Sequence, residues 1–161
     1  MLKIVSIQFS TAERWAVATT VFGVFHHVDH ILRVDHSGWP FTPNVSPFTF
    51  SLLVYPVIAS IFLLREKKWY RVFATGFIFV FLLYAHTILE IPIDQYHVWA
   101  YNESLFSFTL GQPNLLNLKS PLLGIVAVTI SLALAISVLV TLIYFVKEAS
   151  AGKRSSEEGT T

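Results

Sequence analysis

All six histidines of this 161-residue chain lie in two short stretches, residues 26–36 and residues 86–97. Two aspartates of the first stretch, and a glutamate and an aspartate of the second, accompany them. Imidazole and carboxylate groups are the ligands with which proteins bind iron, copper(II), zinc and manganese. Within membrane segments the same groups also move protons. The two stretches therefore contain the residues most suited to bind a metal ion or to transfer protons.

The first stretch has a polar face if it is helical. At 100° per residue, one side of the helix carries His26, Asp29, His30 and Arg33, and His27 lies beside it. Residues four positions apart are one helical turn apart on the same face, close enough to bind a single ion.

The second stretch repeats this spacing, because His86 and Glu90 are also four residues apart. Asp94 and His97 continue the face only if the helix passes Pro92, and a proline inside a helix kinks or ends it. The position of Asp94 and His97 relative to the pair before the proline therefore depends on how the chain turns at Pro92.

Together the two faces predict a site for iron, copper or zinc. The expected ligands are His26, His30, His86 and Glu90, with His27 and Asp29 as further candidates. The groups expected to orient these ligands are Asp35, His36, Asp94 and His97. The site would belong to an oxidoreductase-like membrane protein that acts on a small or lipid-soluble substrate.

Three other interpretations of the same residues remain open. A b-type haem held between two histidines would exchange electrons with a quinone; Arg33 would pair with a propionate, and Trp39 would help to bind the cofactor. A purely structural contact would pair Glu90 with Arg33 across the helices. Finally, the polar face could dock a non-enzymatic accessory subunit onto a larger membrane complex or onto a second copy of the chain.

The composition is that of a membrane protein. Hydrophobic residues make up 54% of the chain and charged residues 13%, with a mean hydropathy of +0.61, whereas soluble domains contain about 25% charged residues. The net charge of +1 provides no field for nucleic acid. The absence of cysteine excludes disulfides, thiolate metal sites and iron–sulfur clusters.

Four segments are long and apolar enough to cross a bilayer as helices. Apolar and polar residues do not alternate in residues 77–83, as they would in the strands of a membrane barrel. The four segments are residues 15–32, 48–64, 69–91 and 122–146. We therefore predict an all-α, integral membrane four-helix bundle formed by one domain, residues 1–148, followed by a disordered tail, residues 149–161. The sequence Ser10-Thr11-Ala12-Glu13 fits a capping box that starts the first helix.

Lysine and arginine predict the orientation of these helices. Nine of the 11 basic residues fall on the side of the N-terminus, and only Arg33 and Lys119 fall on the other. Cytoplasmic loops carry the excess of basic residues. Both termini should thus be cytoplasmic, and the histidines should lie near the periplasmic or extracellular face.

Overall fold

The computed structural model describes residues 8–33, 47–106 and 109–158, and all regular structure in these ranges is helical. The elements are α1 (Thr11–Arg33), α2 (Pro47–Ser51), α3 (Val54–Leu63), α4 (Lys68–Tyr84), a π-helical turn η1 (Ala85–Leu89), α5 (Pro92–Tyr101) and α6 (Pro121–Glu158). The expected helical fold class is therefore confirmed.

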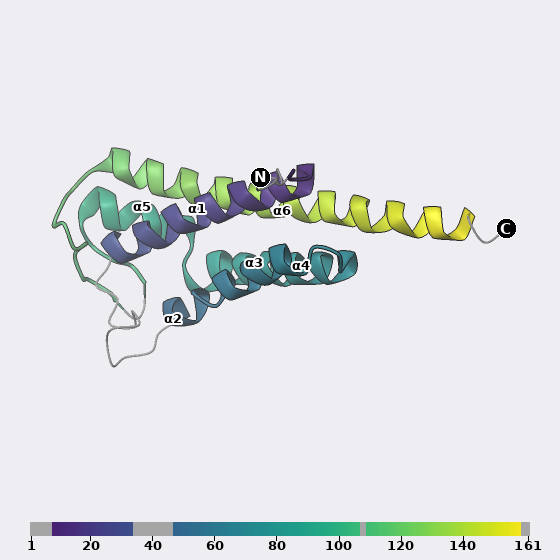
Figure 1. Ribbon diagram of the computed structural model, residues 1–161. Coiled ribbons are helices and arrows are strands. Elements are labelled where there is room, and N and C mark those ends of the chain that lie inside the picture. Colours follow the sequence, from purple (N-terminus) through teal and green to yellow (C-terminus); the bar gives the residue numbers. More distant parts are fainter. Residues whose placement is uncertain (1–7, 34–46, 107–108, 159–161) are drawn as a thin grey trace, which may run out of the picture.

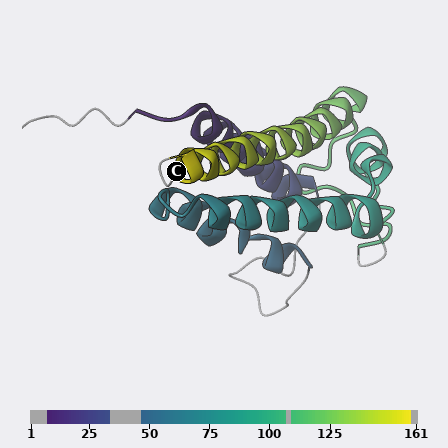
Figure 2. The same cartoon turned by 90° about the vertical axis from the view of Figure 1, so that its right-hand side faces the viewer.

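Helix α6 is the central element of the arrangement. It packs against α1, α4 and α5, and α3 packs mainly against α4. Helix α1 runs antiparallel to α6, and α4 lies beneath both of them in the two views (Figures 1 and 2). The end of α1, the end of η1, helix α5 and the start of α6 consequently meet at one end of the molecule.

Two helical segments have the length and composition needed to cross a membrane, Lys68–Leu89 and Pro121–Ala151. The second expected span differs most from the prediction, because residues 48–63 form two short helices, α2 and α3, that meet at Leu52 and Leu53. Helix α6 also continues past residue 146 to Glu158, so residues 149–158 of the expected tail are helical. Alanine, lysine and glutamate favour helix there, and no proline interrupts it.

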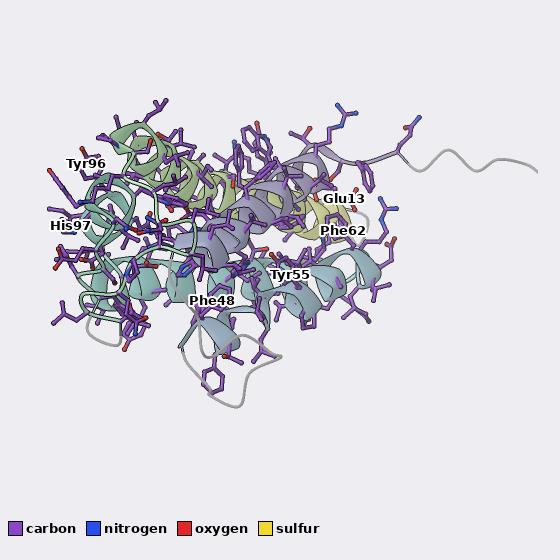
Figure 3. All side chains as sticks on the ribbon, turned by 90° about the vertical axis from the view of Figure 1, so that its left-hand side faces the viewer. Glu13, Phe48, Tyr55, Phe62, Tyr96 and His97 are labelled. Carbon is purple, nitrogen blue, oxygen red and sulfur yellow. The ribbon has the colours of Figure 1, made fainter. Side chains whose placement is uncertain are left out.

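The start of α1 follows the predicted capping box. The backbone N–H of Glu13 donates to Ser10 Oγ at 3.2 Å, and the backbone N–H of Ser10 donates to Glu13 Oε2 at 2.9 Å. Glu13 also pairs with Arg65 at 3.0 Å and with Arg71 at 3.2 Å. These contacts tie the starts of α1 and α4 together at the end of the molecule opposite Tyr96 and His97 (Figure 3).

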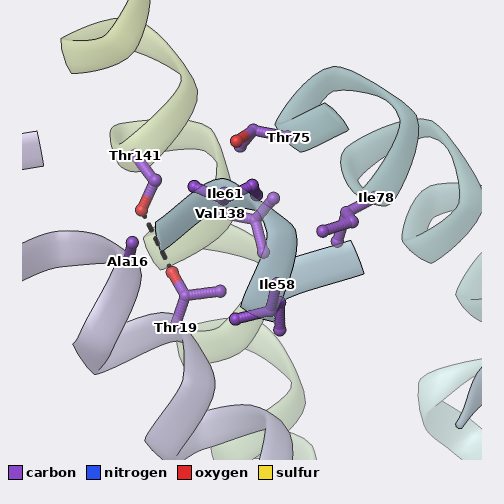
Figure 4. A pocket seen from close by; sticks show the side chains of 8 residues that line it. All are labelled: Ala16, Thr19, Ile58, Ile61, Thr75, Ile78, Val138 and Thr141. Carbon is purple, nitrogen blue, oxygen red and sulfur yellow. Dashed lines mark hydrogen bonds between the residues drawn. The ribbon is translucent and has the colours of Figure 1, made fainter. Parts of the chain in front are cut away.

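Polar side chains are as numerous as hydrophobic ones among the buried residues, while many large apolar side chains lie on the surface. Phe73 and Phe77 of α4 are 72% and 65% exposed. Thr19 of α1 and Thr141 of α6 form a hydrogen bond of 3.1 Å beside a small cavity between α1, α3, α4 and α6, which is lined mainly by apolar side chains (Figure 4). This distribution is the reverse of that in a water-soluble protein of similar size.

Candidate functional site

Three imidazole rings from two elements meet at the end of the molecule where α1 and η1 finish. His26 of α1 lies with its ring centroid 4.8 Å from that of His30 and 4.7 Å from that of His86 in η1. His26 is buried. The helical spacing of His26 and His30 places both on the side of α1 that faces η1, so the two polar faces converge.

The carboxylates of the site are held by Arg33, which is fully buried. Its guanidinium contacts Glu90 Oε1 through Nη1 and donates to Asp29 Oδ2 through Nε at 2.9 Å. Glu90 Oε2 lies 2.9 Å from His30 Nε2. Both oxygens of Glu90 are therefore engaged, and Arg33 makes the contact across the helices that the structural interpretation of the sequence contained.

The π-helical turn explains how the second polar face reaches the first. The backbone N–H of Glu90 donates to Ala85 O at 2.8 Å, five residues earlier, which widens the helix at His86. Glu90 then adopts an extended backbone, and Pro92 begins α5. Single π turns inside α-helices recur at functional sites. Residue spacing alone does not reveal such a turn.

A glutamine and a serine connect two of the imidazoles, and the sequence did not single out either. The side-chain nitrogen of Gln95 lies 3.1 Å from His86 Nδ1, and Ser131 Oγ lies 2.7 Å from Gln95 Oε1 and 3.1 Å from His26 Nδ1. Both residues are buried. The apolar 122–146 segment contains two serines, Ser131 and Ser137, so residue type alone does not identify Ser131 as part of the site. The Nδ1 atoms of His26 and His86 are thus both positioned from α5 and α6.

His27 belongs to a separate set of hydrogen bonds. Its Nδ1 lies 2.7 Å from the Tyr55 hydroxyl and its Nε2 lies 3.0 Å from Ser51 Oγ. Both ring nitrogens therefore have partners on α2 and α3, and the ring centroid lies 5.8 Å from that of His26. His27 extends the polar region toward α3 rather than joining the three rings.

The residues expected to orient the ligands are more widely distributed. His97 lies 2.8 Å, through Nδ1, from the backbone oxygen of Glu103 and packs against Tyr101, so it faces away from the three rings. Asp94 is partly buried, and burial raises the pKa of its carboxyl above the usual value. Instead it is Trp99 that reaches Asp29, donating from Nε1 at 2.8 Å.

Three of the residues that the sequence prediction named, Asp35, His36 and Trp39, lie outside the described residues. Within the described ranges, no group of three or more histidine and carboxylate residues is arranged to hold a metal ion as it stands. The engagement of Glu90 with Arg33 and His30 explains why the expected four-ligand shell is not preassembled.

Comparison with known proteins finds no matching family model, no similar curated protein and no similar solved structure. The function is therefore inferred from the residues of the site.

Proposed function

We propose that this chain is a multi-pass membrane protein whose imidazole cluster, defined as His26, His30 and His86, binds a transition metal for oxidoreductase-like chemistry. The observation that carries the proposal is the contact of three imidazole rings beside two carboxylates that share one arginine.

The surface of the molecule supports the membrane part of the proposal. Helices α4 and α6 are the two candidate spans, and their exposed side chains are largely apolar. Helix α1 buries its polar face against α6 and η1, so α1 can cross the same bilayer with this face shielded from lipid. Nine of the 11 basic residues fall on the predicted membrane side of the N-terminus, which supports a cytoplasmic position for that side and the opposite face for the imidazole cluster.

The charges of the site favour a cation. Asp29 and Glu90 bring two negative charges, and Arg33 brings one positive charge. One negative charge is therefore left in a buried site, where an uncompensated charge is strongly unfavourable. A metal ion on the neighbouring imidazoles supplies the missing positive charge. A protonated histidine would do the same and is the outcome that the experiment below distinguishes.

The hydrogen bonds at Nδ1 suit metal binding. Ligand histidines commonly use one ring nitrogen for the metal and donate from the other to a neighbouring oxygen. His26 Nδ1 can donate to Ser131 Oγ, because that hydroxyl can itself donate to Ala127 O at 3.2 Å. If the Gln95 amide is turned so that its oxygen faces His86, Nδ1 of His86 donates as well. Nε2 of His26 and Nε2 of His86 then each have a lone pair for the metal, whereas Nε2 of His30 contacts Glu90 Oε2 at 2.9 Å.

The geometry favours a metal ion without a porphyrin over the haem alternative. Axial histidines lie on opposite faces of a haem, with the macrocycle between them. The rings of His26 and His86 instead meet edge to face, with 4.7 Å between centroids. Imidazole ligands suit iron, copper(II) and zinc, and iron or copper would supply electron-transfer chemistry to a small or lipid-soluble substrate.

Elemental analysis and absorption spectroscopy of the purified protein test the proposal. We expect about one equivalent of iron, copper or zinc in the native chain, and a clear loss in His26→Asn and His86→Gln. His97→Asn is the matched control, because this histidine lies away from the cluster. Folding of each variant is checked by circular dichroism. If folded native protein holds no stoichiometric metal, or if both cluster variants keep it, the proposal is wrong. An intense Soret band would select haem.

A further inference from the structure

The connection between α5 and α6 has an unusual composition for a segment outside the spanning helices. Between Glu103 and Lys119 the chain has no charged residue. Water-exposed connections are normally rich in polar and charged residues. This connection instead contains five leucines. Its described part, residues 104–106 and 109–120, contains turns and no helix.

Hydrogen bonds fix the described part of the connection against the helices. The buried Asn114 donates from Nδ2 to Val98 O at 3.2 Å and to Leu118 O at 2.7 Å. The backbone N–H of Leu115 donates to Leu32 O at 3.0 Å, at the end of α1. The leucine side chains are therefore presented by a fixed backbone rather than by a loose one.

Three of these leucines occupy the corners of two turns. Gln112 N–H donates to Thr109 O at 3.0 Å, which makes Leu110 a corner residue, 68% exposed. In the second turn the corner residues are Leu115 and Leu116, 52% and 48% exposed, and the turn closes from Asn117 N–H to Asn114 O at 2.9 Å. Turn corners usually carry glycine, proline, asparagine, aspartate or serine.

The exposed leucines continue directly into the apolar surface of α6. Leu118 is exposed after the second turn, and Leu122 and Ile125 are exposed in the first turns of α6. Helix α6 is one of the two candidate spans. Apolar surface thus extends from the corner leucines to the helix that would enter the lipid. Lys119 is the one charged residue of this stretch of sequence.

We propose that these two turns insert their corner leucines, Leu110, Leu115 and Leu116, into the headgroup–acyl boundary of the bilayer at the end where α6 begins. The partner is a lipid surface, and because the segment is uncharged, it requires no anionic lipid. The inference rests on the membrane part of the proposed function and is independent of the metal.

Site-directed spin labelling tests this placement, because the chain has no native cysteine. Single variants Leu110→Cys and Leu116→Cys report on the two turns, and either one suffices if the other does not fold. Phe77→Cys, on the exposed face of α4, is the control for lipid, and Glu103→Cys, which is also exposed, is the control for water. The labelled proteins are reconstituted into phosphatidylcholine vesicles, and collision with oxygen is compared with collision with a water-soluble nickel chelate.

We expect the turn labels and the Phe77 label to collide preferentially with oxygen and the Glu103 label with nickel. If the turn labels behave like Glu103 while Phe77 reports lipid, the turns lie in water and this inference is wrong, although the membrane proposal stands. Shielding of the turn labels from both reagents would show a protein partner and also overturn it. A Phe77 label that reports water would overturn the membrane proposal itself.

Discussion

Arg33 at the end of α1 and Glu90 at the end of η1 form a buried ion pair between residues 57 positions apart in the chain. The same guanidinium binds Asp29 one turn earlier on its own helix. This arrangement sets the relative position of the two polar faces, and therefore of the three imidazole rings. Stability and metal binding should consequently respond to the same residue.

Replacement of Arg33 by methionine should destabilise the protein strongly. The variant keeps much of the volume of the side chain but leaves Asp29 and Glu90 without their shared positive charge. Breaking a buried ion pair from one side costs about 3–5 kcal/mol. Thermal unfolding in detergent measures the change. Arg14→Met, on the exposed side of α1, is the control, and an Arg33 variant that unfolds no earlier than this control would contradict the prediction.

Gly124 permits close contact between α5 and α6, and its replacement by alanine should separate them. A Cβ atom there would lie 2.7 Å from Tyr96 Cδ2 and 2.9 Å from Tyr96 O, so the helix backbone itself must move. Overpacking of this kind costs about 1–3 kcal/mol. Because Gln95 is the neighbour of Tyr96, the shift should also disturb its contact with His86.

Gly76→Ala is the matched control for Gly124→Ala. Its added Cβ would lie 3.9 Å from Leu142 Cδ1, an ordinary van der Waals contact. We expect Gly76→Ala to unfold close to the native temperature and Gly124→Ala well below it. Equal unfolding temperatures would mean that α5 accommodates the methyl group without strain.

Several features of the fold could be predicted from residues that are close together in the sequence, and the structure contains these features. The reciprocal bonds of Ser10 and Glu13 depend only on residues three positions apart. The polar face of α1 follows from the helical repeat. The beginning of a new helix, α5, directly after Ile91 follows from Pro92. Each of these features results from interactions within one or two turns of backbone.

The features that the sequence did not reveal depend on contacts between distant elements. The π turn at His86 adds one residue to a helical turn, and no residue in it marks the change. Gln95 and Ser131 are 36 positions apart in the chain, and nothing marks either residue until α5 and α6 pack together. The division of the second span into α2 and α3 is different, because Pro56 has no backbone N–H to donate to Leu52 O and thus marks a local break that the sequence prediction overlooked.

Gln95 should control the affinity of the imidazole cluster for metal without touching the metal. Its side chain joins His86 to Ser131 and is fully buried. Loss of a group that orients a ligand histidine typically lowers metal affinity by about 10–100-fold. We therefore expect Gln95→Leu to weaken zinc binding by that factor in a competition titration with a chelating dye.

Gln112→Leu is the control for this titration, because Gln112 is exposed in the connection between α5 and α6. It should bind zinc as the native chain does. Unchanged affinity in Gln95→Leu would show that Gln95 serves packing alone, whereas weakening in both variants would indicate a general effect on folding.

Thr75 tests the packing in the middle of the molecule, between the ion pairs of Glu13 at one end and the imidazole cluster at the other. Its hydroxyl is buried beside the small cavity between α1, α3, α4 and α6, and it has no hydrogen-bond partner among the described residues (Figure 4). Replacing a buried, unsatisfied hydroxyl by a methyl group of the same shape removes a desolvation penalty. Thr75→Val should thus raise the free energy of unfolding by about 1 kcal/mol. Thr129→Val is the matched control, since that exposed hydroxyl donates to Ile125 O within α6. A lower unfolding temperature for Thr75→Val than for Thr129→Val would show that the Thr75 hydroxyl is hydrogen-bonded, with a water molecule in the cavity as its partner.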